Sequence, residues 1–176
     1  MTVSGQGAGG PGWPANLVSR IGKAVAWLTL VMVVLTFVTV MLRYGFSLGW
    51  IWLQESVTYL HGMVFMLAAA WALQTDDHVR VDIFYRDLGA RQKARVDLLG
   101  TLVFLVPFCL FLMFASWNYV AVSWAVQESS REAGGLNLVY LQKTLILLLP
   151  ALLLMQAGVS IRNCWSTLRA EPGLKN

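Results

Sequence analysis

Four long apolar segments constrain the fold of this 176-residue chain more than any other feature of its sequence. The hydrocarbon core of a bilayer is about 30 Å thick, and a helix needs roughly 20 apolar residues to cross it. Helices and closed barrels are the only structures that satisfy their own backbone hydrogen bonds in lipid. We therefore predict an all-α integral membrane protein with four transmembrane helices, which run over about 21–42, 52–73, 98–122 and 139–161.

The composition supports this class. Hydrophobic residues make up 57% of the chain and charged residues only 12%, about half the charged share of an ordinary soluble domain. The net charge of +4 comes from bases interleaved with acids, so we predict no nucleic-acid surface. Cys109 and Cys164 lie far apart in the sequence and without metal-ligand spacing, which predicts two reduced thiols and no metal or other cofactor.

The two ends of the chain are polar. Residues 1–19 are rich in Gly and Pro and lack the basic start of a cleavable signal peptide. We predict a flexible N-terminal tail over 1–19, a four-helix membrane domain over 20–165 and a C-terminal tail over 166–176. The first span then stays in the bilayer as a signal anchor.

The distribution of Lys and Arg predicts the orientation. Ten of the 13 basic residues lie in the two terminal regions and in the connection between the second and third spans. The other connections and their flanks hold three, namely Arg43, Arg131 and Lys143. The positive-inside rule then places both termini in the cytoplasm.

The connection between the second and third spans is unusually charged. Residues 76–97 contain ten of the 22 charged residues in the chain. Acids precede bases by four residues, an order that supports a helix. We predict a short amphipathic helix on the inner membrane surface, broken near residues 88–91 and followed by a basic turn. The alternative is a salt-bridged hairpin with no further role. The acid–base pairs are Asp76 with Arg80, Asp82 with Arg86, and Asp87 with Arg91.

The segment "HVRVD" within this connection allows two interpretations. His78, Arg80 and Asp82 alternate in it, but one His and one Asp are a weak basis for a metal site. We favour a structural role, in which these side chains lock the end of the second span to a partner helix.

The second span itself carries Glu55, Tyr59 and His61. Ionisable residues inside a span are functional candidates. At its shallow depth, Glu55 is interpreted first as a carboxylate that is hydrated or paired with Arg43. The alternatives are an ion pair or hydrogen bond to another subunit and, less favoured, proton coupling. Gly62 and Ala69 are small enough to let a neighbouring helix approach closely.

His61 is expected to pack between helices. A haem bound by two histidines of this chain is excluded, because the only other histidine, His78, lies at the cytoplasmic edge of the same helix.

Several charged and aromatic residues are predicted on the outer side. They are candidates for docking a soluble protein partner, although a solvated turn has the same composition. The chain shows no nucleophile–base pair, cofactor loop or metal cluster, so it is not expected to be an enzyme. The docking candidates are Arg43, Trp50, Glu128, Arg131, Glu132 and Lys143.

The chain resembles a known family. Four spans, Glu55 near the start of the second, "HVRVD" followed by "IFYRDLGARQKARVDLLG", and "SSREAGGLNLVYLQKTLILLLPALLLMQAG" are similar to the DctQ-like small membrane subunit of tripartite ATP-independent periplasmic transporters. The resemblance covers roughly residues 22–162. The family often has two adjacent acids at the start of the second span, where this chain has Gln54 and Glu55.

The resemblance implies a function. Such systems reside in the bacterial inner membrane and import organic acids or related solutes with an ion gradient, usually sodium. A periplasmic protein captures the solute, and a large M-type membrane subunit holds the substrate and ion sites. The small subunit is similar to a brace that also helps to dock the binding protein. The candidates for a subunit interface or structural role are Glu55, Tyr59, Gly62, Ala69, His78, Arg80 and Asp82.

Two other functions remain open from the residues alone. One is an autonomous small transporter that works as a homo-oligomer and uses Glu55 as its coupling acid. The other is a membrane anchor of a respiratory complex, which the low histidine count disfavours.

Overall fold

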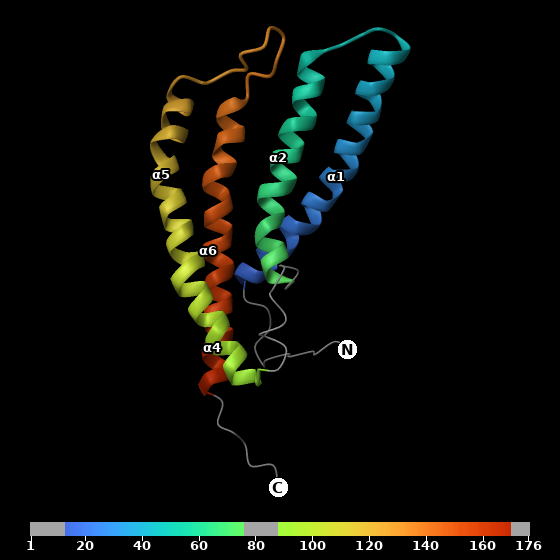
Figure 1. The fold of residues 1–176 in the computed structure, drawn as a ribbon. Helices are drawn as coiled ribbons and strands as arrows, with labels where there is room; N and C mark the ends of the chain where they lie inside the picture. Colours follow the sequence, from blue (N-terminus) through green and yellow to red (C-terminus); the bar gives the residue numbers. More distant parts are fainter. Residues whose placement is uncertain (1–12, 76–87, 170–176) are drawn as a thin grey trace.

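The computed structural model describes residues 13–75 and 88–169, which form long helices lying side by side (Figure 1). Successive helices alternate in direction, so the α1–α2 turn and the α5–α6 loop lie at one end of the bundle, here called the loop end. Four helices are long and apolar enough to cross a membrane, as predicted. The elements are α1 (Trp13–Gly45), α2 (Ile51–Gln74), α4 (Ala90–Gly100), a π-helical turn (Thr101–Leu105), α5 (Val106–Ala125) and α6 (Val139–Arg169).

Helix α6 is the centre of the bundle. It packs against α2 on one side and against α4 and α5 on the other, whereas α1 packs mainly against α2. In its most apolar stretch 33% of the residues are buried, against 11% or less in the other three spans. The other spans therefore turn most of their apolar side chains outward, as membrane helices do.

The core joins all four spans. Its buried members are Val18 of α1, Ala70 of α2, Cys109 of α5, and Leu152 and Leu153 of α6. Two of the five are small side chains, which let neighbouring helices approach closely. The cluster lies toward the end of the bundle opposite the loop end, because it uses the beginning of α1 and the last third of α2.

Helices α1 and α2 meet at a glycine. A methyl group built on Gly22 would overlap the Trp71 indole and lie 2.8 Å from Trp71 Cβ, so only glycine fits under this ring. Three residues after Trp71, Gln74 Nε2 donates a 3.0 Å hydrogen bond to the Ala15 carbonyl oxygen. The first half of α1 is thereby fixed against the last turns of α2.

Helix α1 begins at Trp13, inside the stretch that the sequence predicted as a flexible tail. Its buried residues Ala15, Val18, Gly22 and Val25 recur every three or four positions, which is the spacing of one helix face. Pro14 suits the first helical turn, where its missing N–H is not needed. Packing against α2 thus makes residues 13–19 helical despite their polar neighbours.

The third span also begins earlier than predicted. The expected basic turn at residues 91–95 is helical and belongs to α4. The Gln92 side chain supports this start, since Gln92 Oε1 accepts a 3.1 Å hydrogen bond from the Gly89 N–H. The predicted amphipathic helix, with His78, Arg80 and Asp82, falls on residues 76–87, outside the described residues.

Pro107 explains the π-helical turn between α4 and α5. Proline has no N–H to donate and its ring crowds the carbonyl four residues earlier. The chain accommodates this with hydrogen bonds to the fifth preceding residue, such as Val106 N–H to the Thr101 carbonyl. The proline is therefore accommodated by a local π-turn inside a continuous span.

Candidate functional site

The loop of residues 126–138, which joins α5 to α6, is attached to α2 through Glu55. The Glu55 carboxylate accepts a hydrogen bond from the Ser130 hydroxyl and a 2.6 Å hydrogen bond from the Leu136 N–H. Charge-assisted hydrogen bonds of this kind are about twice as strong as neutral ones. This three-residue arrangement, here called the Glu55 latch, ties the two hairpins of the bundle together at the loop end.

The loop is also hydrogen-bonded within itself. Ser130 N–H donates to the Leu136 carbonyl at 3.0 Å, and Gly135 N–H donates to the Glu132 carbonyl at 3.0 Å. The Glu132 N–H donates in turn to Ser130 Oγ at 3.1 Å. Ser130 therefore both closes the loop and contacts Glu55, so the loop conformation and the Glu55 latch depend on each other.

Two glycines make this closure possible. Gly134 has a φ of 82°, a left-handed conformation that residues with a Cβ adopt at a cost. A Cβ on Gly135 would lie 2.6 Å from Ser130 Cβ and 2.8 Å from Glu55 Oε2, which is closer than real side chains approach. The "SSREAGG" segment thus supplies a hydroxyl donor and two glycines at the positions that the Glu55 latch requires.

A second ionic contact lies beside the latch. Lys143, in the first turns of α6, forms a 2.5 Å ion pair with Glu128 of the loop. The Lys143 ammonium also lies 3.9 Å from the centre of the Tyr119 ring of α5, a favourable cation–π arrangement. The hydrogen bond from Lys143 holds the pKa of Glu128 below its usual value. This contact joins the loop to α5 and α6, as the Glu55 latch joins it to α2.

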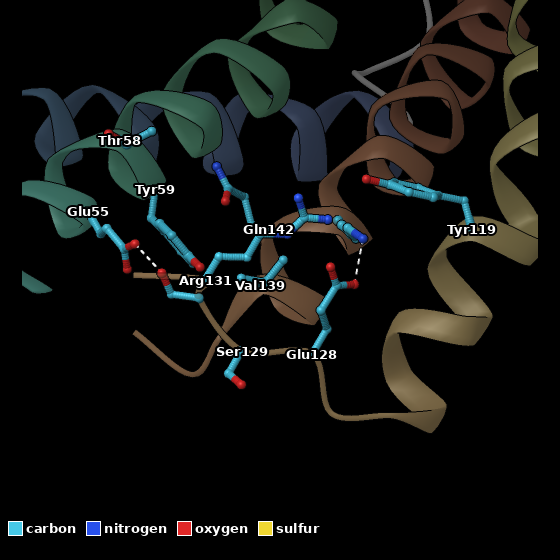
Figure 2. Close-up of a pocket in the computed structure, with 11 residues that line it drawn as sticks. Glu55, Thr58, Tyr59, Tyr119, Glu128, Ser129, Arg131, Val139 and Gln142 are labelled. Carbon is cyan, nitrogen blue, oxygen red and sulfur yellow. Dashed lines mark hydrogen bonds and ion pairs between the residues drawn. The ribbon is translucent and has the colours of Figure 1, made fainter. Parts of the chain in front are cut away.

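The latch and the ion pair border a pocket of about 460 Å³ (Figure 2). Tyr59 lines it, and the Tyr59 hydroxyl is buried without a hydrogen-bond partner in the described part of the chain. Acidic and basic groups both line the pocket, so its surface carries both signs of charge. Its lining residues are Glu55, Thr58, Tyr59, Tyr119, Glu128, Ser129, Ser130, Arg131, Val139, Gln142 and Lys143.

Aromatic residues surround this end of the bundle. Trp124 Nε1 donates a 2.9 Å hydrogen bond to Thr144 Oγ1, and the Trp124 and Tyr140 rings meet edge to face at 4.8 Å. Trp50 and Trp52 stack with ring centres 6.1 Å apart at the start of α2. Trp and Tyr are enriched at membrane–water boundaries, and the same residue types gather around the pocket.

The structure brings together some of the predicted residues and separates others. Glu55, Tyr59, Glu128, Arg131 and Lys143 all line the pocket.

The remaining predicted residues lie elsewhere. Arg43 and Trp50 are exposed near the α1–α2 turn, and Arg43 forms no ion pair with Glu55 in the described ranges. Glu132 is exposed on the loop. Gly62 faces α6, because a Cβ there would lie 3.6 Å from the Gln142 side chain. Ala69 is half-buried on α2.

The sequence does not reveal the partners of Glu55. It suggests a carboxylate that is hydrated, paired with Arg43 or in contact with another subunit, whereas the structure pairs it with Ser130 and Leu136 of the same chain. A serine four residues before a Gly-Gly pair was the available signal for a tight loop. Nothing in the sequence indicated that this loop reaches α2. Within residues 13–75 and 88–169, no group of three or more His, Cys, Asp or Glu side chains could hold a metal ion.

Comparison with known proteins is consistent with this architecture. The family model described as "Tripartite ATP-independent periplasmic transporters, DctQ component" matches residues 32–169. A Vibrio cholerae serotype O1 protein, named C4-dicarboxylate TRAP transporter small permease protein DctQ, is 26% identical over 109 residues. That alignment covers 57% of this chain and 47% of the relative, so it spans about half the length of the relative. No solved structure matches the chain significantly.

Proposed function

We propose a function from the family, since this chain belongs to the DctQ components of tripartite ATP-independent periplasmic (TRAP) transporters. The family consists of multi-pass transporter subunits and not of enzymes. In our proposal, the chain is the small permease subunit that braces a large M-type subunit in the membrane. It also contributes to the surface on which a periplasmic solute-binding protein docks.

The transported solutes are proposed to be organic acids or related compounds, taken up with a sodium gradient. The name of the Vibrio cholerae relative refers to C4-dicarboxylates, which is the support for an acidic substrate. The substrate and ion sites are assigned to the large subunit.

We place the loop end in the periplasm and both chain termini in the cytoplasm of a bacterial inner membrane. The support is the charge distribution, because ten of the 13 basic residues belong to the opposite side. With this orientation the Glu55 latch and the pocket face the compartment in which a binding protein diffuses.

The Glu55 latch is the observation that carries the docking role. A loop that is hydrogen-bonded to α2 and ion-paired to α6 presents fixed side chains to a partner, so binding costs little ordering entropy. Arg131 and Glu132 are exposed on this loop. They offer one charge of each sign for electrostatic recognition of a soluble partner.

A pull-down from native membranes tests the proposal. The tagged chain is extracted in mild detergent, and the proteins that accompany it are identified by mass spectrometry. A large polytopic protein recovered in near-equal amount supports the brace role. Recovery of this chain alone, as a defined homo-oligomer, contradicts it and favours an autonomous transporter.

Docking is tested separately by charge reversal on the loop. Arg131→Glu and Glu132→Lys should weaken solute-dependent transport by the complex while the large subunit is still recovered. Unchanged transport in both variants would remove the loop from the docking surface.

A further inference from the structure

His61 lies near the middle of a transmembrane helix. It follows Ile51, the first residue of α2, by ten positions and precedes Gln74, the last, by 13. At 1.5 Å per residue these are about 15 Å and about 20 Å along the helix axis. The hydrocarbon core is about 30 Å thick, so no part of the imidazole is close to either membrane surface.

The imidazole of His61 is nevertheless exposed on the outside of the bundle. It forms no hydrogen bond with any residue in the described part of the chain. The hydroxyls in the first span avoid this problem, because Thr36 and Thr39 each donate to the carbonyl four residues earlier, at 2.7 Å. The histidine side chain does not hydrogen-bond to its own helix as a threonine hydroxyl does. Its neutral ring has one nitrogen that donates and one that accepts, and both need a partner.

Lipid is therefore an unfavourable neighbour for this position. Hydrocarbon offers no hydrogen-bond partner, and ionisable residues within membrane spans almost always face another protein surface or a water-filled cavity. In an isolated bundle the imidazole would have neither. The exposure of His61 thus indicates that another polypeptide covers this part of α2.

The surrounding surface suits a helix. Thr58, His61 and Phe65 are exposed at spacings of three and four residues, so they share one side of α2, and Phe65 is 70% exposed. Ala68 and Ala72 continue the same side with small side chains, which allow close helix approach. We call these five residues the His61 face.

The other two sides of α2 are already occupied. Trp71 packs over Gly22 of α1, and Gly62 faces Gln142 of α6. The outward side of α5 differs in chemistry, because Phe108, Phe111 and Phe114 expose 55–86% of their surface there. An aromatic and apolar surface of this kind fits lipid, whereas the His61 face does not.

We propose that the His61 face binds a transmembrane helix of the large transport subunit, and that this helix presents a carboxylate, hydroxyl or amide to the His61 imidazole. The inference rests on the proposed function for the existence of that subunit. The Ala68 and Ala72 positions let the partner helix approach α2, and the hydrogen bond at His61 fixes its depth in the membrane.

Photocrosslinking tests the surface directly. A benzoylphenylalanine residue is placed at position 65 or, as a control of the same aromatic type, at position 114 of α5, in the full chain expressed with its native transporter partners. We expect an adduct with the large subunit from position 65 and none from position 114. An adduct from position 114 but not from 65, or an adduct containing two copies of this chain, would overturn the inference.

Substitution tests the hydrogen bond. His61→Leu should weaken association with the large subunit about fivefold or more, the change expected for one interhelical hydrogen bond. His61→Gln, which keeps a donor and an acceptor, should lose less. Asn118→Leu is the matched control, because Asn118 is exposed on α5 and lies about 10 Å from the loop end of that helix.

The outcomes distinguish a failure of the proposed function from a failure of the role of His61. If the unsubstituted chain recovers no large subunit, the proposed function fails. If the large subunit is recovered equally with unsubstituted chain, His61→Leu and Asn118→Leu, the role of His61 fails while the proposed function stands.

Discussion

The Glu55 carboxylate of α2 accepts a 2.6 Å hydrogen bond from the backbone N–H of Leu136, a residue 81 positions further along the chain. Because the same carboxylate binds the Ser130 hydroxyl, one side chain joins α2 to the loop between α5 and α6. Glu55 therefore holds the loop end together within the chain. Its contribution is measurable in the isolated chain.

Glu55→Gln should destabilise the protein. The glutamine side chain has an NH₂ donor in place of one accepting oxygen. This donor would face another donor, either the Ser130 hydroxyl or the Leu136 N–H, so one hydrogen bond is lost. Loss of a hydrogen bond to a charged group costs about 1.5–3 kcal/mol, and the part-exposed position puts the effect at the lower end. Thermal unfolding in detergent, followed by tryptophan fluorescence, measures it. Glu132→Gln in the same loop is the control, and equal melting temperatures for the two variants would contradict the prediction.

Gly135→Ala should release the loop without altering any charge. The added methyl group would lie 2.6 Å from Ser130 Cβ and 2.8 Å from Glu55 Oε2, so Ser130 must move away from the carboxylate. Tryptic cleavage after Arg131 reports this release, and we expect it to be at least several-fold faster than in the unsubstituted chain. Gly45→Ala, where a Cβ meets nothing within 4 Å, should leave the rate unchanged. A cleavage rate unaffected by Gly135→Ala would show that the loop is not held by this contact.

Gly22→Ala should loosen the α1–α2 contact. The methyl group overlaps the Trp71 indole, and overpacking a close contact typically costs about 1–3 kcal/mol. Gly158→Ala is the comparison, since a Cβ there meets nothing within 4 Å and alanine is the better helix former. We expect a lower melting temperature for Gly22→Ala and an equal or higher one for Gly158→Ala. The reverse order would mean that α1 does not rest on Trp71 through Gly22.

The Glu128–Lys143 ion pair should make stability depend on pH in the acid range. Lys143 lowers the pKa of Glu128 in the folded protein below the ordinary value of 4.5. The unfolded chain then binds the proton more readily, so this contribution is complete above about pH 4.5 and is lost as the pH falls through the lowered pKa. Melting temperatures between pH 3 and 7 should converge for the unsubstituted chain and Lys143→Met at the acid end. A constant difference across that range would show that Glu128 is not the titrating group.

Tyr59→Phe should be neutral or stabilising. The Tyr59 hydroxyl is buried and has no hydrogen-bond partner within the described residues, so its removal eliminates a desolvated polar group at little cost. The ring packing is preserved. A melting temperature that falls by as much as for Glu55→Gln would instead indicate that the hydroxyl has a partner in solution.

The sequence by itself determined the four spans, because the thickness of the bilayer sets the length of an apolar helix. The family resemblance, carried by the order of the short polar segments, agrees with the family model that matches residues 32–169. These properties depend on local chemistry, which is written in consecutive residues.

The tertiary structure alone decided which residues meet. Helix α1 begins at Trp13 because Val18 and Gly22 pack against α2, and a Gly- and Pro-rich start gives no sign of that contact. Glu55 and Leu136 are separated by 81 residues, so their hydrogen bond depends on the arrangement of α2 beside α6. His61 faces outward because α1 and α6 occupy the other sides of α2. Helix spacing is a local property, but the direction in which each helix turns its polar side chains is fixed only when the helices pack together.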